Sequence, residues 1–356
     1  MIQLHLTKLE VKDAVIDLAT ILLGIGLALS FLTAISLGAN DAATPTDCAV
    51  GAGVISVRNA VILFATFTGI GALLQGYQVM KTIGKGIVPE VELLGAITIS
   101  LTAALWVLIC SYKGLDVSVT YATIGSVVGY GIAAHGVENV NFGILQKVFL
   151  SWISSPLCSM ALAYSIYTAL KKILIKRMWT EGIQKVISWL LLISLCFSAY
   201  SFGANDVGNA TGVYVTVAEK LGRVPDYTAM ILLSAFGALG IAIGGLTWGR
   251  RVIETVAFRI TRIDLVMGLA AEISNAIVVY LFTTIPYMIF GYGLPISTSL
   301  ASNGSIIGVG LAKSYKSINT RTVIRLVITW IITVPTTALM CMAIFTILNQ
   351  IIVIPL

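Results

Sequence analysis

Long apolar segments make up most of this chain, and they fall into two groups of five separated by a short basic stretch. A helix needs about 20 apolar residues to cross a bilayer, and backbone exposed to lipid must satisfy its own hydrogen bonds. The segments therefore predict a bundle of membrane-spanning helices. They lie at about residues 14–37, 59–80, 93–112, 117–134, 143–170, 186–203, 228–248, 265–285, 294–312 and 323–348.

The charge content supports this interpretation. Only 11% of the residues are charged and 58% are hydrophobic, whereas soluble proteins carry about 25% charged residues. We expect an all-α integral membrane protein with about 10–12 membrane segments. The net charge of +6 is modest, and no basic stretch is interleaved with aromatic residues, so nucleic acid is not an expected partner.

Cysteine and histidine usage argues against several kinds of site. The five cysteines are scattered singly, without a CxxC pair, and the two histidines have no partner at ligand spacing. Isolated cysteines in apolar segments are usually small buried hydrophobic residues. We therefore expect neither a structural metal nor a Ser–His–Asp site, and no metal ion beyond Na⁺.

The two groups of segments carry the same motifs in the same order, which indicates an internal duplication. Gly-Ala-Asn-Asp ends at Asp41 and again at Asp206. A second motif begins at Gly114 and again at Gly293, and it runs through serines and threonines into regularly spaced glycines. The chain is thus divided into a first repeat, a basic linker and a second repeat, at residues 1–170, 171–185 and 186–356.

Five segments per repeat place the second repeat upside down relative to the first, the inverted-topology architecture of many secondary transporters. The lysines and arginines of the linker 171–185 place it in the cytoplasm by the positive-inside rule, with both termini outside. The fourth segment of each repeat is short and rich in glycine and hydroxyl side chains. We expect it to be broken or re-entrant rather than a simple span.

The Gly-Ala-Asn-Asp motifs are the first candidate site. A charge within an apolar layer is costly, and such residues usually line a bundle interior or an ion path. We expect the Gly-Ala step to unwind the helix and the Asn and Asp oxygens to bind Na⁺ or a proton. The alternative is a helix cap in a surface loop. The predicted coupling-ion residues of both motifs are Asn40, Asp41, Thr44, Asn205, Asp206 and Asn209.

The hydroxyl clusters in the two fourth segments are the second candidate site. A helix that starts with serine and threonine presents hydroxyls and free N–H groups at its N-terminus, where an anion is favoured. The alternative is that these side chains only mediate helix packing. The predicted anion-binding residues are Ser118, Thr120, Ser297, Thr298 and Ser299, with Asp41 and Asp206 beside them.

A third acidic side chain has no equivalent in the first repeat. Glu272 shares a helix face with Asn275 in an apolar segment, and it is either a ligand of the coupling ion or a buried, protonated structural carboxyl. Asp47 and Asp116 stand at segment edges, where we expect them to be solvated.

Together these motifs resemble the inorganic phosphate transporter (PiT) family of phosphate permeases, over essentially the whole chain. The resemblance rests on Gly-Ala-Asn-Asp-Val-x-Asn-Ala from Gly203 and on Gly-Leu-Pro-Ile-Ser-Thr-Ser from Gly293. It implies inverted repeats and phosphate uptake driven by Na⁺ or H⁺. Carried over by position, it also implies two sets of residues. At the ion and phosphate site it places Asn40, Asp41, Asn205 and Asp206, and in contact with the anion it places Ser118, Thr120, Ser297, Thr298 and Ser299.

Several departures of the chain from the family pattern affect the candidate sites. Thr44 replaces the second asparagine of the first motif, and Val119 replaces a threonine. Tyr121 and Leu300 stand where the family has histidines. These losses leave the coupling ion and the choice between phosphate and sulfate open. The two aspartates favour phosphate, because a carboxylate accepts the proton that phosphate carries and repels sulfate.

Three functions fit a pair of buried aspartates in a membrane. The first is a secondary transporter that works by alternating access, and the second is a passive anion channel. The third, an intramembrane aspartyl protease, leaves the paired asparagines and hydroxyl clusters unexplained. We therefore expect a transporter rather than an enzyme, with phosphate or sulfate, Na⁺ or H⁺, and the lipid bilayer as partners. Whether it forms a homodimer stays open.

Overall fold

The computed structural model is helical wherever it describes regular structure. It describes residues 2–112, 117–175, 180–222, 226–250, 253, 263–314 and 320–351. The α-helices are α1 (Ile2–Asp41), α2 (Asp47–Gly51), α3 (Val57–Gln75), α4 (Tyr77–Lys81), α5 (Leu93–Tyr112), α6 (Val119–His135), α7 (Phe142–Ile175), α8 (Glu181–Thr211), α9 (Val215–Gly222), α10 (Asp226–Gly244), α12 (Leu265–Phe290), α13 (Thr298–Lys313) and α14 (Thr320–Ile351).

Eight helical stretches of the described chain are long and apolar enough to cross a membrane. The predicted fourth segments form α6 and α13, which are continuous helices of 17 and 16 residues. They are not among the eight, and this agrees with their short, glycine-rich sequences. The eight candidate spans are Thr20–Asp41, Val57–Gln75, Leu93–Cys110, Phe142–Leu174, Glu181–Lys220, Asp226–Gly249, Leu265–Phe290 and Val323–Ile351.

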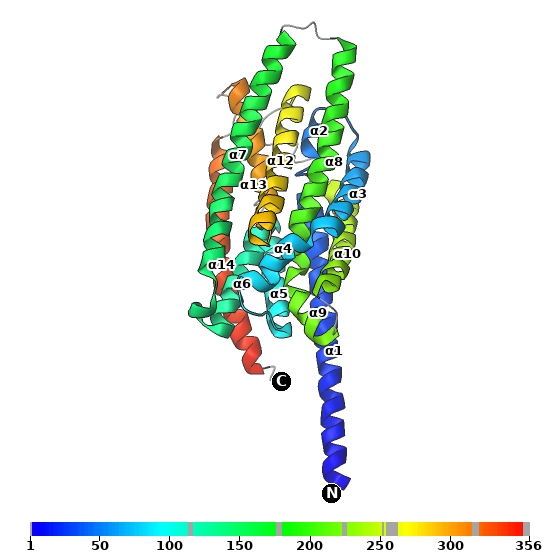
Figure 1. The fold of residues 1–356 in the computed structure, drawn as a ribbon, viewed down its shortest axis with the longest axis vertical. Helices are drawn as coiled ribbons and strands as arrows, with labels where there is room; N and C mark the ends of the chain where they lie inside the picture. Colours follow the sequence, from blue (N-terminus) through cyan, green and yellow to red (C-terminus); the bar gives the residue numbers. More distant parts are fainter. Residues whose placement is uncertain are drawn as a thin grey trace.

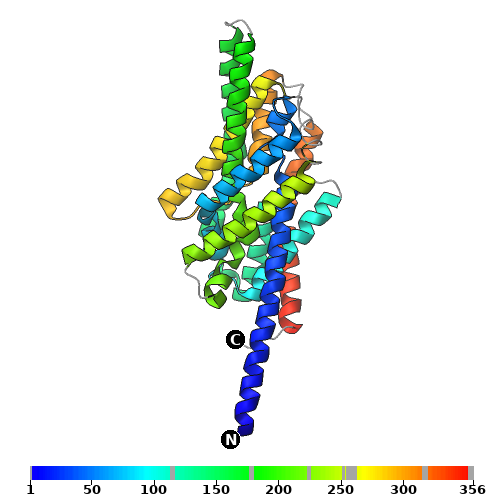
Figure 2. The same cartoon turned by 90° about the vertical axis from the view of Figure 1, so that its right-hand side faces the viewer.

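The helices form one elongated bundle (Figure 1). The green helices α7 and α8 extend together beyond the bundle at one end, and the two chain termini lie at the other end. The turned view in Figure 2 shows the same separation, with the start of α1 projecting past the terminus end. The linker and the termini are therefore on opposite faces of the molecule.

Helices of the two halves pack in equivalent pairs. Helix α1 packs on α10, while α8, its counterpart in the second half, packs on α3, the counterpart of α10. In the same way α6 packs on α14 and α13 packs on α7. The halves are thus interleaved, and the tertiary contacts repeat the duplication that the sequence indicates.

Glycines allow two of these helix pairs to approach closely. A Cβ atom at Gly38 of α1 would lie 2.0 Å from the Ile241 carbonyl oxygen of α10, and one at Gly203 of α8 would lie 2.0 Å from the Thr68 carbonyl oxygen of α3. Helix α1 stays helical to Asp41 and α8 stays helical to Thr211. The prediction that the Gly-Ala step unwinds the helix is therefore wrong, because glycine here provides contact between helix backbones.

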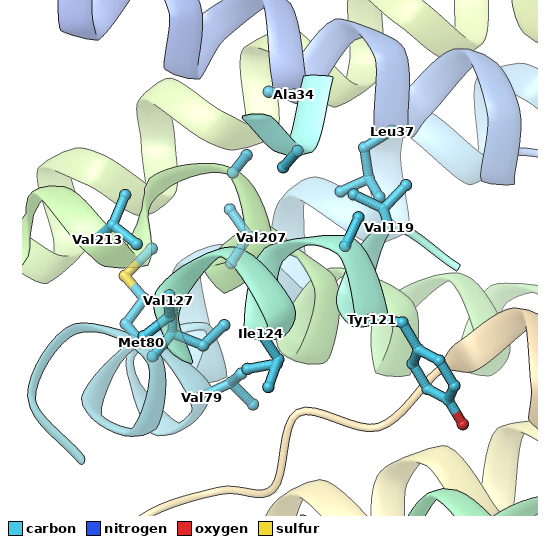
Figure 3. Close-up of a cluster of buried hydrophobic side chains, with 14 of the residues drawn as sticks. Ala34, Leu37, Val79, Met80, Val119, Tyr121, Ile124, Val127, Val207 and Val213 are labelled. Carbon is cyan, nitrogen blue, oxygen red and sulfur yellow. The ribbon is translucent and has the colours of Figure 1, made fainter. Parts of the chain in front are cut away.

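A shared apolar core holds the motif-bearing helices in place (Figure 3). Val119 and Ile124 of α6, Val207 of α8 and Leu37 of α1 are all buried in one cluster. Burying apolar side chains is worth about 25 cal/mol per Å² of apolar surface. This packing fixes the start of α6 beside the last turns of α8, which is where the predicted site residues meet.

Candidate functional site

The first Gly-Ala-Asn-Asp motif ends its helix, whereas the second lies within one. Helix α1 ends at Asp41, four residues before Pro45, while α8 continues past Asp206 through Asn209. A proline lacks an N–H group and disfavours helical conformation in the residue before it, here Thr44. The Thr44-Pro45 pair therefore explains why the two copies differ. Both aspartates are buried, with exposed fractions of 4% and 1%.

Asp41 is held by donors from both halves. Its Oδ1 accepts from the neighbouring Asn40 Nδ2 at 3.0 Å. It also accepts from the Ser299 hydroxyl at 3.1 Å, and Ser299 belongs to the first turn of α13 in the second half. The hydroxyl cluster of one half thus binds the aspartate of the other.

Asp206 shows the reciprocal arrangement. Its Oδ1 accepts from Asn209 Nδ2 at 3.0 Å, one turn along α8. The Thr120 hydroxyl of α6, in the first half, lies 3.5 Å from the same oxygen, and the Thr298 hydroxyl also contacts this carboxyl. The two aspartates are close enough for their charges to interact. Residues of both repeats therefore meet in one buried site.

Three buried oxygen atoms of this site have no hydrogen-bond donor. They are Asp206 Oδ2, Asn205 Oδ1 and Asn209 Oδ1. The amide nitrogen of Asn205 donates to Thr283 Oγ1 at 2.7 Å and to the Leu294 carbonyl at 2.9 Å, which fixes the direction of its oxygen. Buried acceptors without partners are costly. Carboxylate and amide oxygens are hard ligands, so a small hard cation would satisfy them.

Two helix N-termini begin at the site. Ser118 caps α6 and Ser297 caps α13, and each hydroxyl accepts from a backbone N–H three residues later. The positive end of a helix dipole favours an anion nearby. The two serine hydroxyls are engaged as caps, while Thr120, Thr298 and Ser299 in the first turns are the side chains that contact the aspartates.

Thr44 lies at the edge of this site. Its carbonyl oxygen accepts from the Ser302 hydroxyl at 3.4 Å, and its side chain is buried. It occupies the turn after α1 and has a contact through its backbone rather than through its hydroxyl.

Glu272 has other neighbours than the Asn-Asp pairs. Its carboxyl lies beside Asp47 and Cys48, and its neighbour on α8 is Ser198, about two turns before Asp206. The prediction that Asp47 is solvated is wrong, because its exposed fraction is 2%. Asp116 lies outside the described residues.

A family histidine position is filled by an aromatic stack. The ring of Tyr121 stacks on Trp152 with centroids 3.8 Å apart, and Trp152 donates to the Pro295 carbonyl at 2.8 Å. Tyr121 is buried. The residue that replaces the histidine therefore packs against Trp152 of α7, and Trp152 in turn binds the loop before α13.

Two contributors to the site could not be singled out from the sequence. Thr283 and the Leu294 carbonyl orient Asn205. Thr283 and Thr284 are adjacent hydroxyl residues within the otherwise apolar second half of α12, and this interruption is the signal that points to them. A backbone carbonyl carries no such signal.

Comparisons with known proteins find similarity along most of the chain. The model described as the phosphate transporter family matches residues 37–341. A protein of Pyrococcus furiosus, named as a candidate phosphate permease, is 33% identical, and the alignment covers 92% of this chain and 96% of the relative. A similarly named protein of Thermococcus kodakarensis is 31% identical, with 93% and 97% covered.

A solved structure described as the sodium-dependent phosphate transporter is also similar. It shares 28% sequence identity and superposes with a TM-score of 0.81. The match covers 93% of this chain and 100% of that chain. The similarity therefore covers nearly all of this chain.

Proposed function

Since this chain belongs to the phosphate transporter family, we propose that it takes up inorganic phosphate together with Na⁺ by alternating access. It is a membrane protein with several spanning helices. The observation that carries the proposal is the exchange of contacts between halves. Ser299 of the second half binds Asp41 of the first, and Thr120 of the first half contacts Asp206 of the second.

Such a shared site suits alternating access. A site built from both repeats is opened to one side or the other when the repeats move relative to each other. The interleaved packing of α1 on α10 and of α3 on α8 supports two inverted repeats that move against each other. The separation of the termini from the linker end supports a cytoplasmic linker and outward-facing termini.

Phosphate is the anion that these side chains suit best. Thr120, Thr298 and Ser299 offer neutral hydroxyls at two helix N-termini, which bind an oxyanion without an added positive charge. At neutral pH phosphate carries a proton that it can donate to Asp41 or Asp206. Sulfate carries none, so the aspartates repel it.

Sodium suits the remaining acceptors. The oxygens of Asp206, Asn205 and Asn209 that lack donors form a hard ligand set. Two aspartates and a phosphate dianion together are costly to enclose unless cations enter with them. The similar solved structure is described as sodium-dependent, which supports Na⁺ over H⁺ as the coupling ion.

Uptake into proteoliposomes tests the proposal. Purified protein is reconstituted, and radiolabelled phosphate accumulation is followed under an inward Na⁺ gradient or an inward proton gradient, each imposed separately. We expect uphill accumulation with Na⁺ alone, weak competition by sulfate, and loss of accumulation when the gradient collapses. Accumulation under the proton gradient alone, or preferred uptake of sulfate, would overturn the proposed coupling or substrate.

A further inference from the structure

We infer that Trp152 is a positioning residue for the proposed phosphate site, because its indole joins the two hydroxyl clusters to each other. Trp152 belongs to α7 and is buried, with an exposed fraction of 6%. Its side chain contacts residues next to the clusters, so it acts on the anion through them. The inference rests on the function proposed above, since it concerns the spacing of the groups that bind phosphate there.

The segment before α13 needs hydrogen-bond donors from other parts of the chain. Residues 293–296 form no helix or strand, and all four are buried. A buried carbonyl group without a donor is costly, and irregular backbone at membrane depth is tolerated only where the protein satisfies it. Each of the four consecutive carbonyl oxygens accepts from a side chain of a different helical element.

Most of these donors belong to the opposite half of the chain. They are Thr82 for Gly293, Asn205 for Leu294, Trp152 for Pro295 and Thr120 for Ile296. Thr120 and Asn205 are themselves residues of the proposed site, whereas Thr82 and Trp152 stand outside it. Trp152 donates from its indole nitrogen at 2.8 Å. The segment is therefore held in place by groups that do not have to bind the anion or the cation.

The same indole also holds the start of α6. The ring of Tyr121 stacks on the ring of Trp152 with centroids 3.8 Å apart and planes inclined by 23°. Tyr121 directly follows Thr120 in the first turn of α6. Stacked aromatic rings prefer a defined geometry, so a change in the position of the indole is transmitted to Thr120.

The hydrogen bond of Trp152 lies equally close to the start of α13. Pro295 precedes the capping Ser297 by two residues, and Thr298 and Ser299 form the first turn. Ser299 donates to Asp41 at 3.1 Å. One rigid side chain thus contacts the beginnings of both helices that carry the hydroxyl clusters. A site that is already arranged for its ligand binds it more tightly, and the indole fixes the spacing of the two clusters.

Trp152→Phe tests this role, because phenylalanine keeps a ring on Tyr121 and lacks the indole N–H. Phosphate binding to the purified full-length protein in Na⁺ is measured by calorimetry, and folding is measured by thermal unfolding. We expect the Kd for phosphate to rise at least fivefold. Trp106→Phe is the matched control, because Trp106 of α5 donates its indole N–H to Thr333 of α14 at 3.2 Å. We expect both variants to lower the melting temperature to a similar extent, and the control to keep its Kd within twofold of wild type.

A double-mutant cycle separates positioning from a general loss of stability. If the indole acts through Thr120, the effects of Trp152→Phe and Thr120→Val on the Kd are coupled, and their combined effect is smaller than the product of the separate effects. Trp106→Phe combined with Thr120→Val is expected to give the product. A product in both cycles would contradict the role of Trp152.

An unchanged Kd in Trp152→Phe would overturn the inference, as would equal rises in Trp152→Phe and Trp106→Phe. If Trp152→Phe does not fold, Tyr121→Leu keeps the indole hydrogen bond and removes the stack. It is expected to raise the Kd at least threefold, and an unchanged Kd would again contradict the inference. Absence of phosphate binding to the wild type would contradict the proposed function itself, so the two failures are distinguishable.

Discussion

The Thr120 hydroxyl has a central place among the contacts of the proposed phosphate site. It accepts from Asn209 Nδ2 at 2.9 Å and donates to the Ile296 carbonyl at 3.1 Å. The carboxyl of Asp206 lies 3.5 Å away as a second acceptor. One hydroxyl from the first half therefore links α8 to the loop before α13. The proposal requires this hydroxyl to turn toward the anion when phosphate binds.

Replacing Thr120 by valine is expected to raise the KM for phosphate about 10-fold or more. The substitution keeps the side-chain shape and removes the hydroxyl, and a hydrogen bond to a charged group is worth about 1.5–3 kcal/mol. Initial rates of Na⁺-driven uptake at varied phosphate concentrations measure the effect. Thr120→Ser keeps the hydroxyl and is expected to stay within about threefold of wild type. An unchanged KM in Thr120→Val would show that the hydroxyl has only a packing role.

The sequence indicated the individual side chains of this site better than their contacts. Both Asn-Asp pairs and both hydroxyl clusters stand out as polar groups in apolar segments, and the structure brings Asp41, Ser299, Thr120 and Asp206 into one interior. The sequence did not show that each aspartate contacts the hydroxyl cluster of the opposite half. Asp47 is a similar case, because only the packing of α2 on α12 decides that it is buried.

At the level of helices, the close contacts of α8 depend on glycine. Gly203 of α8 faces the Thr68 carbonyl of α3. Gly71 of α3 faces the Tyr200 carbonyl of α8, and a Cβ atom added at Gly71 would lie 1.9 Å from that carbonyl oxygen. Both contacts are between backbones, so no side-chain rotation can relieve an added methyl group. The position of Asp206, one turn beyond Gly203, depends on this approach.

Gly203→Ala is expected to destabilise the protein by about 1–3 kcal/mol, the usual range for overpacking. A methyl group there forces α8 away from α3. Gly69→Ala is the matched control on α3, because a Cβ atom at Gly69 meets nothing within 4 Å. Alanine is favoured over glycine in a helix by about 1 kcal/mol, so the control is expected to be neutral or stabilising. Thermal unfolding in detergent measures both variants, and equal melting temperatures would contradict the packing role of Gly203.

The apolar segments predicted the helices well and their internal detail less well. Every predicted segment corresponds to a helix in the described residues, because long apolar runs leave few alternatives in a bilayer. The Gly-Ala step was misinterpreted as a break. Glycine is compatible both with unwinding and with close packing, and only the neighbouring helix decides between them. The short extension of α8 beyond Asp206 follows from the absence of a proline such as Pro45.

At the scale of the whole molecule, ion pairs join the two halves at the terminus end. Lys85, after α4, lies 2.7 Å from Glu219 of α9 and 2.8 Å from Asp226 of α10. Lys220 pairs with Glu90 in the same way. Partial burial lowers the pKa of Lys85, but its hydrogen bonds to Asp226 and Glu219 outweigh this effect and raise it. Lys85 therefore stays charged, and we expect the pairs to resist separation of the two halves at this end.

Lys85→Gln is expected to increase the fraction of molecules in which the terminus end is open. Partly exposed ion pairs contribute about 0.2–1 kcal/mol, so the open population rises up to about fivefold. Opening is measured with a cysteine introduced in place of Thr123, in a background where serine replaces Cys158 and Cys196. The rate at which a membrane-impermeant reagent labels this thiol from the terminus side reports how accessible it is. Lys171→Gln at the linker end is the control and is expected to change nothing. Equal labelling rates in the Lys85→Gln and Lys171→Gln variants would contradict a closing role.

The duplication was predictable from the sequence, whereas the interleaving of its halves was not. Repeated motifs in the same order can be recognised from the amino-acid sequence alone. Which helix of one half packs on which helix of the other depends on surfaces that form only after folding, as the pairing of α6 with α14 and of α13 with α7 shows. The inverted topology and the orientation in the membrane stay predictions from segment number and charge.

The most direct test of a joint site for sodium and phosphate is an equilibrium binding measurement. Phosphate binding to the purified protein is followed by calorimetry in Na⁺ and in choline at equal ionic strength, for the wild type and for Asp206→Asn. If both ligands share the aspartates, each strengthens the binding of the other by the same factor. We predict at least tenfold tighter phosphate binding in Na⁺ for the wild type and no sodium dependence in Asp206→Asn. Equal wild-type affinities in Na⁺ and choline would contradict a shared site.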